Sequence, residues 1–274
     1  MRQLYLSALH IKPEYMEAYV KAMSDYRIDY LYGYPSAYFW LARNLIDYNE
    51  RLPMKVVITS SENLFDYQRE TMQEAFEATV RETYGQSEKI CAASECEHGR
   101  LHLWPEAGKA EFLPVDGNSQ SYSAAQMLVC TSLLNQAMPL IRYDIQDMVE
   151  TPLDTEPCTC GRGLPVLGKV LGRFEDMVLT PDGRRVGHLV GYLSAGAPVK
   201  EIQVIQETLH EIRVKVVPAH DWSSLDEKVL VDKLRSRIGD CAIKVDQVPA
   251  IERSKSGKFR AVISKVESIL PENK

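Results

Sequence analysis

The stretch Gly172-Arg173-Phe174-Glu175-Asp176-Met177 divides the chain into two segments of different character. It combines a turn glycine, one arginine, an aromatic residue and two adjacent acids, and an apolar run follows it. A joint about which two domains rotate needs residues that tolerate more than one backbone conformation. We therefore predict a hinge at residues 172–177, between a domain at 1–171 and a smaller domain at 178–274. The simpler interpretation is a polar turn before a strand.

The length, charge and cysteine content of the chain exclude several classes of protein. The chain has 274 residues, enough for one large domain or two ordinary ones. Its 32 basic and 38 acidic residues argue against a nucleic-acid partner held by phosphate neutralisation. We expect no signal peptide, because Ser7 interrupts the short apolar stretch of residues 1–9 and Lys12 and Glu14 follow at once. We expect no membrane partner, because no apolar run approaches the roughly 18 residues needed to cross a bilayer. Six cysteines then indicate a reducing, cytoplasmic location, with metal ligands or buried thiols rather than disulfides.

The segment before the predicted hinge has the pattern of an α/β domain. Helices are expected at residues 14–27, 39–46 and 66–76, and strands at 54–59, 79–83, 127–134 and 140–143. The order of strand, helix and strand between residues 54 and 83 favours a mainly mixed or parallel sheet. Residues 101–104 and 110–113 flank a short polar turn, and we expect them to form a hairpin.

The segment after the predicted hinge has the pattern of a small α+β domain. Pro181-Asp182-Gly183 predicts the turn of a hairpin between residues 177–180 and a strand that begins at Arg185. Further strands are expected at residues 202–206, 212–217 and 243–248. Ser223 or Ser224 is a suitable N-cap for a helix that continues to about Ile238.

Three polar blocks could bind a ligand. Tyr84-Gly85-Gln86-Ser87-Glu88 follows a predicted strand, where open α/β sheets bind ligands. Its tyrosine could stack on a base, and Glu88 could hold a hard cation. The block 141–147 ends in Asp147, which could accept both hydroxyls of a ribose. The loop 253–260 contains Lys258, whose long side chain could reach an anion. Each block could equally be a solvated surface loop.

The order and spacing of these blocks resemble the adenylate-forming enzymes, and most closely their phenylacetate–coenzyme A ligase-like branch. The shared signature is Tyr-Gly-x-Ser-Glu, a strand with Arg-Tyr and a later Asp, Gly-Arg-x-acid-Asp, and Ser-Gly-Lys-x-Arg. The resemblance covers nearly the whole chain. Four further blocks look like that branch: Tyr32-Gly33-Tyr34-Pro35-Ser36, Ile58-Thr59-Ser60-Ser61-Glu62, Glu95-Cys96-Glu97-His98-Gly99 and Cys158-Thr159-Cys160-Gly161-Arg162.

The resemblance implies a partial adenylate-forming core with a mobile C-terminal lid. Such enzymes join a carboxylic acid to the α-phosphate of Mg-ATP, release pyrophosphate, and often pass the acyl group to coenzyme A or another thiol. The implied nucleotide site consists of Tyr84 on the adenine with Gly85 and Ser87 beside it, Glu88 on Mg²⁺, Asp147 on the ribose with Arg173 on the same side, and the turn Ser60-Ser61-Glu62 at the edge of the adenine.

Three further elements follow from the resemblance. Lys258 would come from the lid to neutralise charge that develops on the α-phosphate and the carboxylate, an interaction worth several kcal/mol in a dry site. Glu175 and Asp176 would occupy the hinge, and residues 32–36 would line the acyl pocket. The sequence does not identify the acid.

The chain departs from the family pattern at three points. The Ser/Thr/Gly-rich phosphate loop expected before these blocks is not in the sequence, Gln146 replaces the glycine usual before Asp147, and Glu175 replaces an aspartate. Three hypotheses follow: a ligase crippled by the missing loop, a non-catalytic nucleotide-binding or interaction module, and one half of a split ligase completed by an N-terminal segment. Exposed apolar surface would also favour a homo-oligomer.

The cysteines support a separate hypothesis. Cys158 and Cys160, together with Cys96 and His102, could form a tetrahedral zinc site of three thiolates and one imidazole. His102 alternates with apolar Leu101 and Leu103, so we prefer it to His98 as the fourth ligand. Some members of the branch look similar and would hold structural zinc. The alternative is a set of free thiols beside a hydrogen-bonded histidine, and Cys91, Cys130 and Cys241 are expected to be simple thiols.

Overall fold

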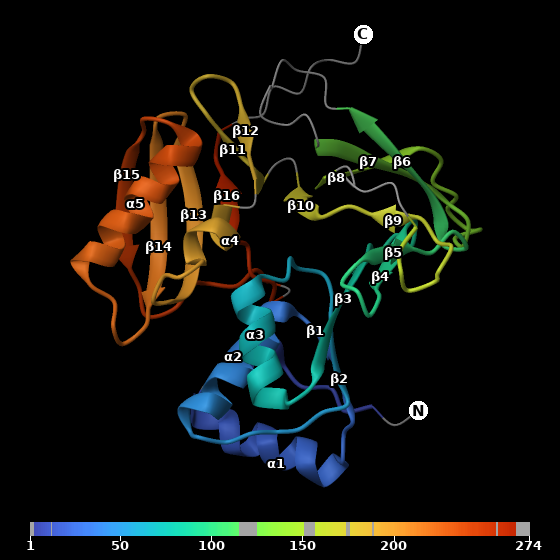
Figure 1. The fold of residues 1–274 in the computed structure, drawn as a ribbon, viewed down its shortest axis with the longest axis horizontal. Helices are drawn as coiled ribbons and strands as arrows, with labels where there is room; N and C mark the ends of the chain where they lie inside the picture. Colours follow the sequence, from blue (N-terminus) through green and yellow to red (C-terminus); the bar gives the residue numbers. More distant parts are fainter. Residues whose placement is uncertain are drawn as a thin grey trace.

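The computed structural model describes residues 3–11, 13–114, 125–150, 157–173, 176–187, 189–255 and 257–266. Phe174 and Glu175 of the predicted hinge, Ser256 of the basic loop and the segment 151–156 lie outside the described residues. Figure 1 shows three groups of elements, formed by residues 13–85, 92–173 and 178–264.

The first group is a parallel sheet segment covered by helices. Strands β1 (Tyr30–Gly33), β2 (Val56–Thr59) and β3 (Thr79–Gly85) pair in parallel, and α1 (Met16–Tyr26), α2 (Pro35–Asp47) and α3 (Asp66–Phe76) accompany them. The short helices η1 (Ala8–His10) and η2 (Pro13–Tyr15) come first. The core contains Val57, Val80 and Phe76, none of which is exposed. Helix α2 begins earlier than the sequence predicts, because Pro35 fits the first helical turn, where its missing N–H costs nothing.

Strand β3 changes partner along its length. Residues 79–82 pair in parallel with β2, whereas residues 83–85 pair antiparallel with β4 (Ala92–Glu95). The sheet continues through β5 (Leu101–Leu103) to β9 (Val166–Leu167) in the order β1-β2-β3-β4-β5-β9. Tyr84 and Gly85 therefore belong to the strand itself, beyond its parallel part, and only the residues after Gly85 form the loop.

A second sheet is antiparallel. It has the order β10-β8-β7-β6, with β6 (Gly108–Pro114), β7 (Ala125–Ser132), β8 (Tyr143–Glu150) and β10 (Val170–Arg173). The predicted hairpin of residues 101–104 with 110–113 is wrong, because β6 pairs with β7. Gly108 begins β6 so close to the neighbouring backbone that a Cβ would lie 1.9 Å from the carbonyl oxygen of Ile90. The strand predicted at 140–143 begins only at Tyr143, so Asp147 lies inside β8.

The C-terminal group matches the predicted α+β pattern. Strands β11 (Val178–Leu179) and β12 (Arg185–Val186) form the expected hairpin, and a four-stranded sheet has the order β15-β14-β13-β16. Its strands are β13 (Val199–Thr208), β14 (Glu211–Pro218), β15 (Ala242–Gln247) and β16 (Val262–Ser264), and its helices are α4 (Leu189–Ser194) and α5 (Ser224–Ile238). Ser223 caps α5 by accepting a hydrogen bond from the backbone N–H of Asp226.

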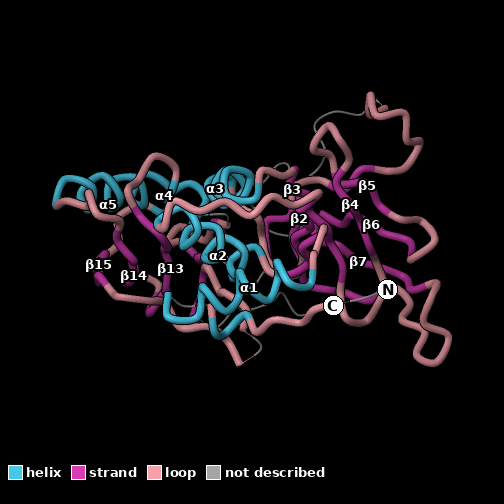
Figure 2. Tube along the Cα trace, turned by 90° about the horizontal axis from the view of Figure 1, so that it is seen from below, coloured by secondary structure: helices cyan, strands magenta, loops and turns pink. Residues whose placement is uncertain are grey.

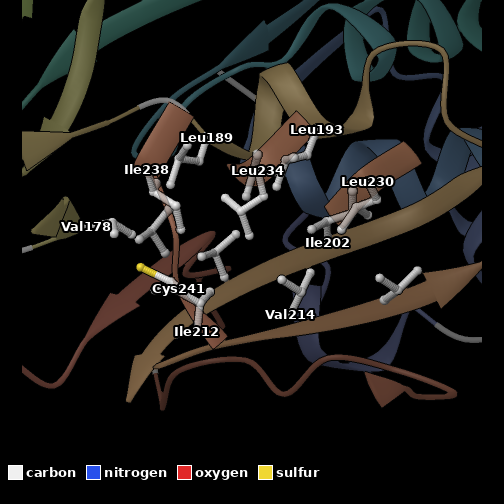
Figure 3. Close-up of a cluster of buried hydrophobic side chains, with 14 of the residues drawn as sticks. Val178, Leu189, Leu193, Ile202, Ile212, Val214, Leu230, Leu234, Ile238 and Cys241 are labelled. Carbon is white, nitrogen blue, oxygen red and sulfur yellow. The ribbon is translucent and has the colours of Figure 1, made fainter. Parts of the chain in front are cut away.

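The helices of this group bury one face of its sheet. Figure 3 shows Leu189 and Leu193 of α4 and Leu230 and Leu234 of α5 above the apolar side chains of the sheet, among them Ile202. Figure 2 shows α2 and α3 between the C-terminal sheet and strands β2 and β3. Phe65, at the start of α3, packs into the same cluster as the C-terminal core, which joins the groups. Among the described residues, no helix combines the length and apolarity that crossing a membrane requires.

Candidate functional site

The structure brings together three of the predicted nucleotide-binding residues. The Tyr84 hydroxyl donates a hydrogen bond of 2.6 Å to Oδ2 of Asp147, and Nε of Arg173 lies 4.0 Å from Oδ1 of the same carboxylate. The register of β8 and β10 places Arg173 opposite Asp147, whereas Tyr84 comes from the other sheet. The three side chains therefore meet where the two sheets approach each other.

Burial sets the charges of this cluster. Loss of solvent raises the pKa of Asp147 above its ordinary value, although the Tyr84 hydrogen bond and the Arg173 charge act against that rise. The pKa of Tyr84 is also raised, first by burial and then by the nearby Asp147 carboxylate. Tyr84 is therefore a neutral donor, and Asp147 is the acceptor between a phenol and a guanidinium.

The rest of the Tyr84 block forms a turn. Gly85 ends β3, and the backbone N–H of Lys89 donates to the carbonyl of Gln86 at 3.1 Å, which closes the turn around Ser87 and Glu88. Ser87 is exposed and Glu88 is half-buried. Among the described residues, no cationic side chain forms an ion pair with the Glu88 carboxylate.

The Ser60-Ser61-Glu62 turn follows β2. The backbone N–H of Ser60 donates to the Gly33 carbonyl at 3.0 Å, and Ser61 has φ 70°, a left-handed conformation uncommon outside glycine. Glu62 is engaged at both oxygens: Oε2 accepts from the Ser36 backbone N–H at 3.0 Å, and Oε1 accepts from Ser36 Oγ at 3.1 Å and from the Phe259 backbone N–H at 2.5 Å. This carboxylate joins α2 to the C-terminal basic loop.

Lys258 lies in a tight turn of that loop. The Ser254 carbonyl accepts from the Gly257 N–H at 2.8 Å, and the Ser254 hydroxyl accepts from the Lys258 N–H at 3.0 Å. No described carboxylate forms an ion pair with the Lys258 ammonium, whereas Arg260 pairs with Asp176. No hydrogen bond or ion pair between described residues connects Glu88 or Lys258 to the cluster around Asp147.

A buried charged junction accompanies Glu62, and the sequence did not reveal it. Glu201 of β13 accepts a hydrogen bond of 2.6 Å from Trp40 Nε1 of α2 and pairs with Arg253 of the basic loop. Burial raises the pKa of both Glu62 and Glu201, and the Arg253 charge opposes the rise. The sequence gives no signal for this junction, because Glu201 and Arg253 are common residue types and lie far from each other and from Trp40 in the chain.

A cavity of about 680 Å³ opens beside this junction. Its wall on one side is α2, with Ser36, Ala37 and Trp40, and on the other side the C-terminal sheet with residues 247–251 and Gly257. The predicted acyl-pocket stretch therefore contributes Ser36 to a cavity that the Lys258 loop also borders. The cluster around Asp147 lines no part of it.

The four predicted metal ligands also meet. The ligand atoms of Cys96, His102, Cys158 and Cys160 all lie within 4.8 Å of one another. The sulfur atoms of Cys96 and Cys158 are 3.8 Å apart, and Cys160 Sγ lies 3.4 Å from His102 Nε2. Nδ1 of His102 lies 3.1 Å from the carbonyl oxygen of Leu164, which orients the ring so that Nε2 faces the thiols.

These distances fit a tetrahedral ion. With Zn–S bonds of about 2.3 Å, two sulfur ligands of a tetrahedron are separated by about 3.8 Å, the distance between the Cys96 and Cys158 sulfurs. His98 contributes its backbone N–H, at 3.4 Å from Cys96 Sγ, and not its ring. The cluster could therefore hold one metal ion through three thiolates and one imidazole.

Known proteins resemble this chain in sequence. A family model described as the CapK C-terminal domain matches residues 178–265. Protein CapK of Staphylococcus aureus is 26% identical over 244 residues, covering 86% of this chain and 51% of that protein. A phenylacetate-coenzyme A ligase of Thermus thermophilus is 29% identical over 244 residues, covering 78% of this chain and 54% of that enzyme. The chain thus spans about half the length of these curated relatives.

Solved structures show the same fold. A 2-hydroxyisobutyryl-CoA ligase in the postadenylation state, in complex with R3-HIB-AMP, gives a TM-score of 0.72 at 21% identity, covering 93% of this chain and 58% of that one. The same ligase in the thioesterification state, with 2-HIB-AMP and CoA, gives 0.51 at 20% identity over the same shares. The homologues of this chain therefore include CapK and a phenylacetate-coenzyme A ligase, and its fold is that of the adenylate-forming ligases, as the resemblance of its motifs predicts.

Proposed function

We propose that this chain takes part in the ATP-dependent adenylation of a carboxylic acid, followed by transfer of the acyl group to coenzyme A or another thiol. A carboxylate oxygen would attack the α-phosphorus, pyrophosphate would leave, and the thiol sulfur would then displace AMP from the acyl carbon. The meeting of Tyr84, Asp147 and Arg173 from separate strands carries the proposal, because it assembles the residues implied for the nucleotide. The homologous ligase supports the reaction class.

The nucleotide would bind beside this cluster. The Tyr84 ring offers a stacking face for adenine, and Gly85, Ser87 and the Ser60-Ser61-Glu62 turn would border the base. Asp147 would accept the ribose hydroxyls, with Arg173 beside it. Its Oδ2 accepts from Tyr84, and Nε of Arg173 lies 4.0 Å from Oδ1, beyond hydrogen-bond distance, so Oδ1 could accept from the sugar. Glu88 would bind Mg²⁺, consistent with a carboxylate that has no described cationic partner.

The lid would be residues 178–274, rotating about residues 172–177. Gly172 has φ 104°, a conformation that side chains rarely adopt, so this position favours glycine. The TM-score is higher for the postadenylation state of the solved ligase than for its thioesterification state, 0.72 against 0.51. This difference supports a C-terminal arrangement like that of the former state, in which Lys258 would serve adenylation.

The cluster of Cys96, His102, Cys158 and Cys160 would hold one structural zinc ion. Two observations support this assignment. The ligand atoms lie within 4.8 Å of one another, and the backbone N–H groups of His98 and Arg162 point at the sulfur atoms of Cys96 and Cys160. All four positions would be filled by protein ligands, so the ion would supply stability and not chemistry. The cytoplasmic location inferred from the cysteines stays a prediction.

A second candidate is one half of a ligase that is completed by another segment. The chain spans 51% and 54% of the curated relatives. Leu133, Leu134, Met138 and Ile141, on the connection between β7 and β8, are each more than half exposed. Such an apolar surface favours a covering partner, either a complementing N-terminal segment or another copy. A non-catalytic nucleotide-binding module would need no such partner.

The exchange of labelled pyrophosphate into ATP separates these candidates. The chain is assayed with a panel of aliphatic and aromatic carboxylic acids, alone and with the N-terminal half of a homologous ligase. Exchange that depends on one acid supports the ligase, and exchange only in the mixture supports the split form. AMP binding without exchange in either case would leave the non-catalytic module, and neither binding nor exchange would overturn all three.

A further inference from the structure

We propose that Glu62 is a positioning residue that seats the Lys258 loop against the rest of the molecule, and that a carboxylate is required for this. The Glu62 carboxylate accepts the backbone N–H of Phe259, the residue after Lys258, at 2.5 Å and across 197 positions of the sequence. The functional value of this contact rests on the proposed role of Lys258. The contact itself does not depend on that role.

The donor count explains why the residue is an acid. Three donors converge on Glu62: the Ser36 backbone N–H, the Ser36 hydroxyl and the Phe259 backbone N–H. The two backbone donors address different oxygens of the carboxylate. Glutamine has one oxygen and one NH₂ group, so in either orientation it turns an N–H group toward one of these backbone donors. An isosteric amide therefore keeps the volume of the side chain and loses one of its two links.

The surroundings of Glu62 come from both sides of the contact. Ser36 at the start of α2 and Tyr67 of α3 belong to the first group, whereas Arg253, Phe259 and Glu201 belong to the C-terminal group. Arg253 is the cation shared by the two acids: it pairs with Glu201, lies 4.7 Å from the centre of the Phe259 ring, and its charge opposes the rise in the pKa of Glu62 that burial causes. Arg253 of the basic loop thus supplies the positive charge beside Glu62, the acid that binds this loop.

The link also reaches the cavity wall. Ser36 lines the cavity from α2 and Gly257 lines it from the basic loop. Because Glu62 bonds to Ser36 and to Phe259, one carboxylate fixes the distance between the two sides of the cavity next to Lys258. Trp40 adds a parallel link through its hydrogen bond to Glu201. When the Lys258 loop is bound to Glu62, the opening of the cavity between α2 and this loop therefore has a fixed width.

Limited trypsin digestion tests the seating directly. The bond that trypsin cleaves after Lys258 contains the N–H group that Glu62 accepts, so the seated loop protects this bond. We expect Glu62→Gln to increase cleavage after Lys258 at least tenfold. Ser36→Ala, which removes the hydroxyl and keeps both backbone donors, is the matched control and should stay within threefold of the wild type. Equal cleavage rates in wild type and Glu62→Gln would overturn the proposal.

Two checks keep the outcomes distinct. Cleavage in α1, at Lys21, reports the general integrity of the fold; if Glu62→Gln raises it as well, Glu62→Asp, whose oxygens are withdrawn by one methylene, replaces it with the same expectation. For an acid that supports pyrophosphate exchange, Glu62→Gln should lower kcat at least tenfold, and adding it to Lys258→Ala should slow exchange by less than threefold further, whereas a role independent of Lys258 would slow the double variant by the full tenfold. Absence of exchange both alone and with the N-terminal half of a homologous ligase refutes the ligase proposal, and the digestion result alone then decides the seating.

Discussion

The hydroxyl of Tyr84 and the carboxylate of Asp147 lie 63 positions apart in the sequence and form a hydrogen bond of 2.6 Å. This bond joins β3 of the mixed sheet to β8 of the antiparallel sheet. Each of the two residues was predicted to contact a different part of a nucleotide, the base and the ribose. Their direct contact means that the two halves of the proposed nucleotide site are held at a fixed separation before any ligand binds.

Tyr84→Phe should lower stability. The variant keeps the ring and removes the only described hydrogen-bond donor to Oδ2 of Asp147, a buried carboxylate. Leaving such an acceptor unpaired costs about 1–3 kcal/mol, measurable as a shift of the midpoint of urea unfolding. Tyr32→Phe is the control because Tyr32 is 68% exposed. An unchanged midpoint in Tyr84→Phe would show that water replaces the phenol without cost.

Lys258→Ala should separate catalysis from binding. If the chain is a ligase, adenylation falls by about two orders of magnitude or more, because the cation that offsets charge at the α-phosphate is lost. AMP binding, measured by calorimetry, should change little, since the base and ribose contacts come from other residues. Lys255→Ala, in the same loop, is the control and should keep its activity. Full turnover in Lys258→Ala would remove this residue from the proposed mechanism.

The purified protein should contain about one equivalent of zinc, removable by a strong chelator with a fall in melting temperature. Cys158→Ser should lower both zinc content and melting temperature, because it removes a thiolate from the set that spans 4.8 Å. Cys241→Ser is the matched control, since Cys241 is buried in the C-terminal core and far from that set in the sequence. Less than a tenth of an equivalent of zinc in carefully purified protein would refute the site.

Glu82→Gln should stabilise the protein at high pH. Burial, and then the charge of Glu95, raise the pKa of Glu82 to about 7, against an ordinary value of 4.5. The folded state therefore holds this proton more tightly than the unfolded state, so stability falls as pH rises from about 4.5 to about 7. The amide variant escapes this loss, which amounts to at most about 3 kcal/mol.

Melting curves of wild type and Glu82→Gln between pH 4 and pH 8 measure the effect. The two proteins should converge near pH 4, where the wild-type carboxyl is largely protonated in both states, separate between about pH 4.5 and about pH 7, and keep a constant difference above pH 7. Glu97→Gln, at an exposed acid paired with Arg162, is the control and should show no gain at high pH. Parallel curves for Glu82→Gln and wild type would show that Glu82 ionises normally.

Local signals in the sequence predicted local structure well. The helix at residues 66–76 and the N-cap Ser223 follow from periodicity and capping, which depend on neighbours in the chain. The strand-helix-strand order likewise predicted the parallel pairing of β2 with β3. The four predicted metal ligands also lie together in the structure. This prediction was possible because Cys and His are rare enough for their spacing to be informative.

Contacts between segments distant in the sequence could not be predicted from periodicity, capping or residue spacing. Strands β9 and β10 are two and four residues long, and partners distant in the sequence define them. The hairpin was predicted wrongly because glycine is common in turns. Gly108 instead begins β6, where a side chain would collide with the backbone of Ile90. The partner of Glu62 is 197 positions away, and nothing in the short stretch around either residue indicates the other.

The metal-ligand cluster has a mechanical consequence for the nucleotide site. Cys96 and His102 precede β6, whereas Cys158 and Cys160 follow β8. An ion that binds all four would close a loop of the chain containing β6, β7 and β8, and closing such a loop restricts the unfolded chain. The segment that carries Asp147 on its last strand would then be held at both ends by a single ion, so loss of that ion would loosen the support of the proposed ribose-binding carboxylate.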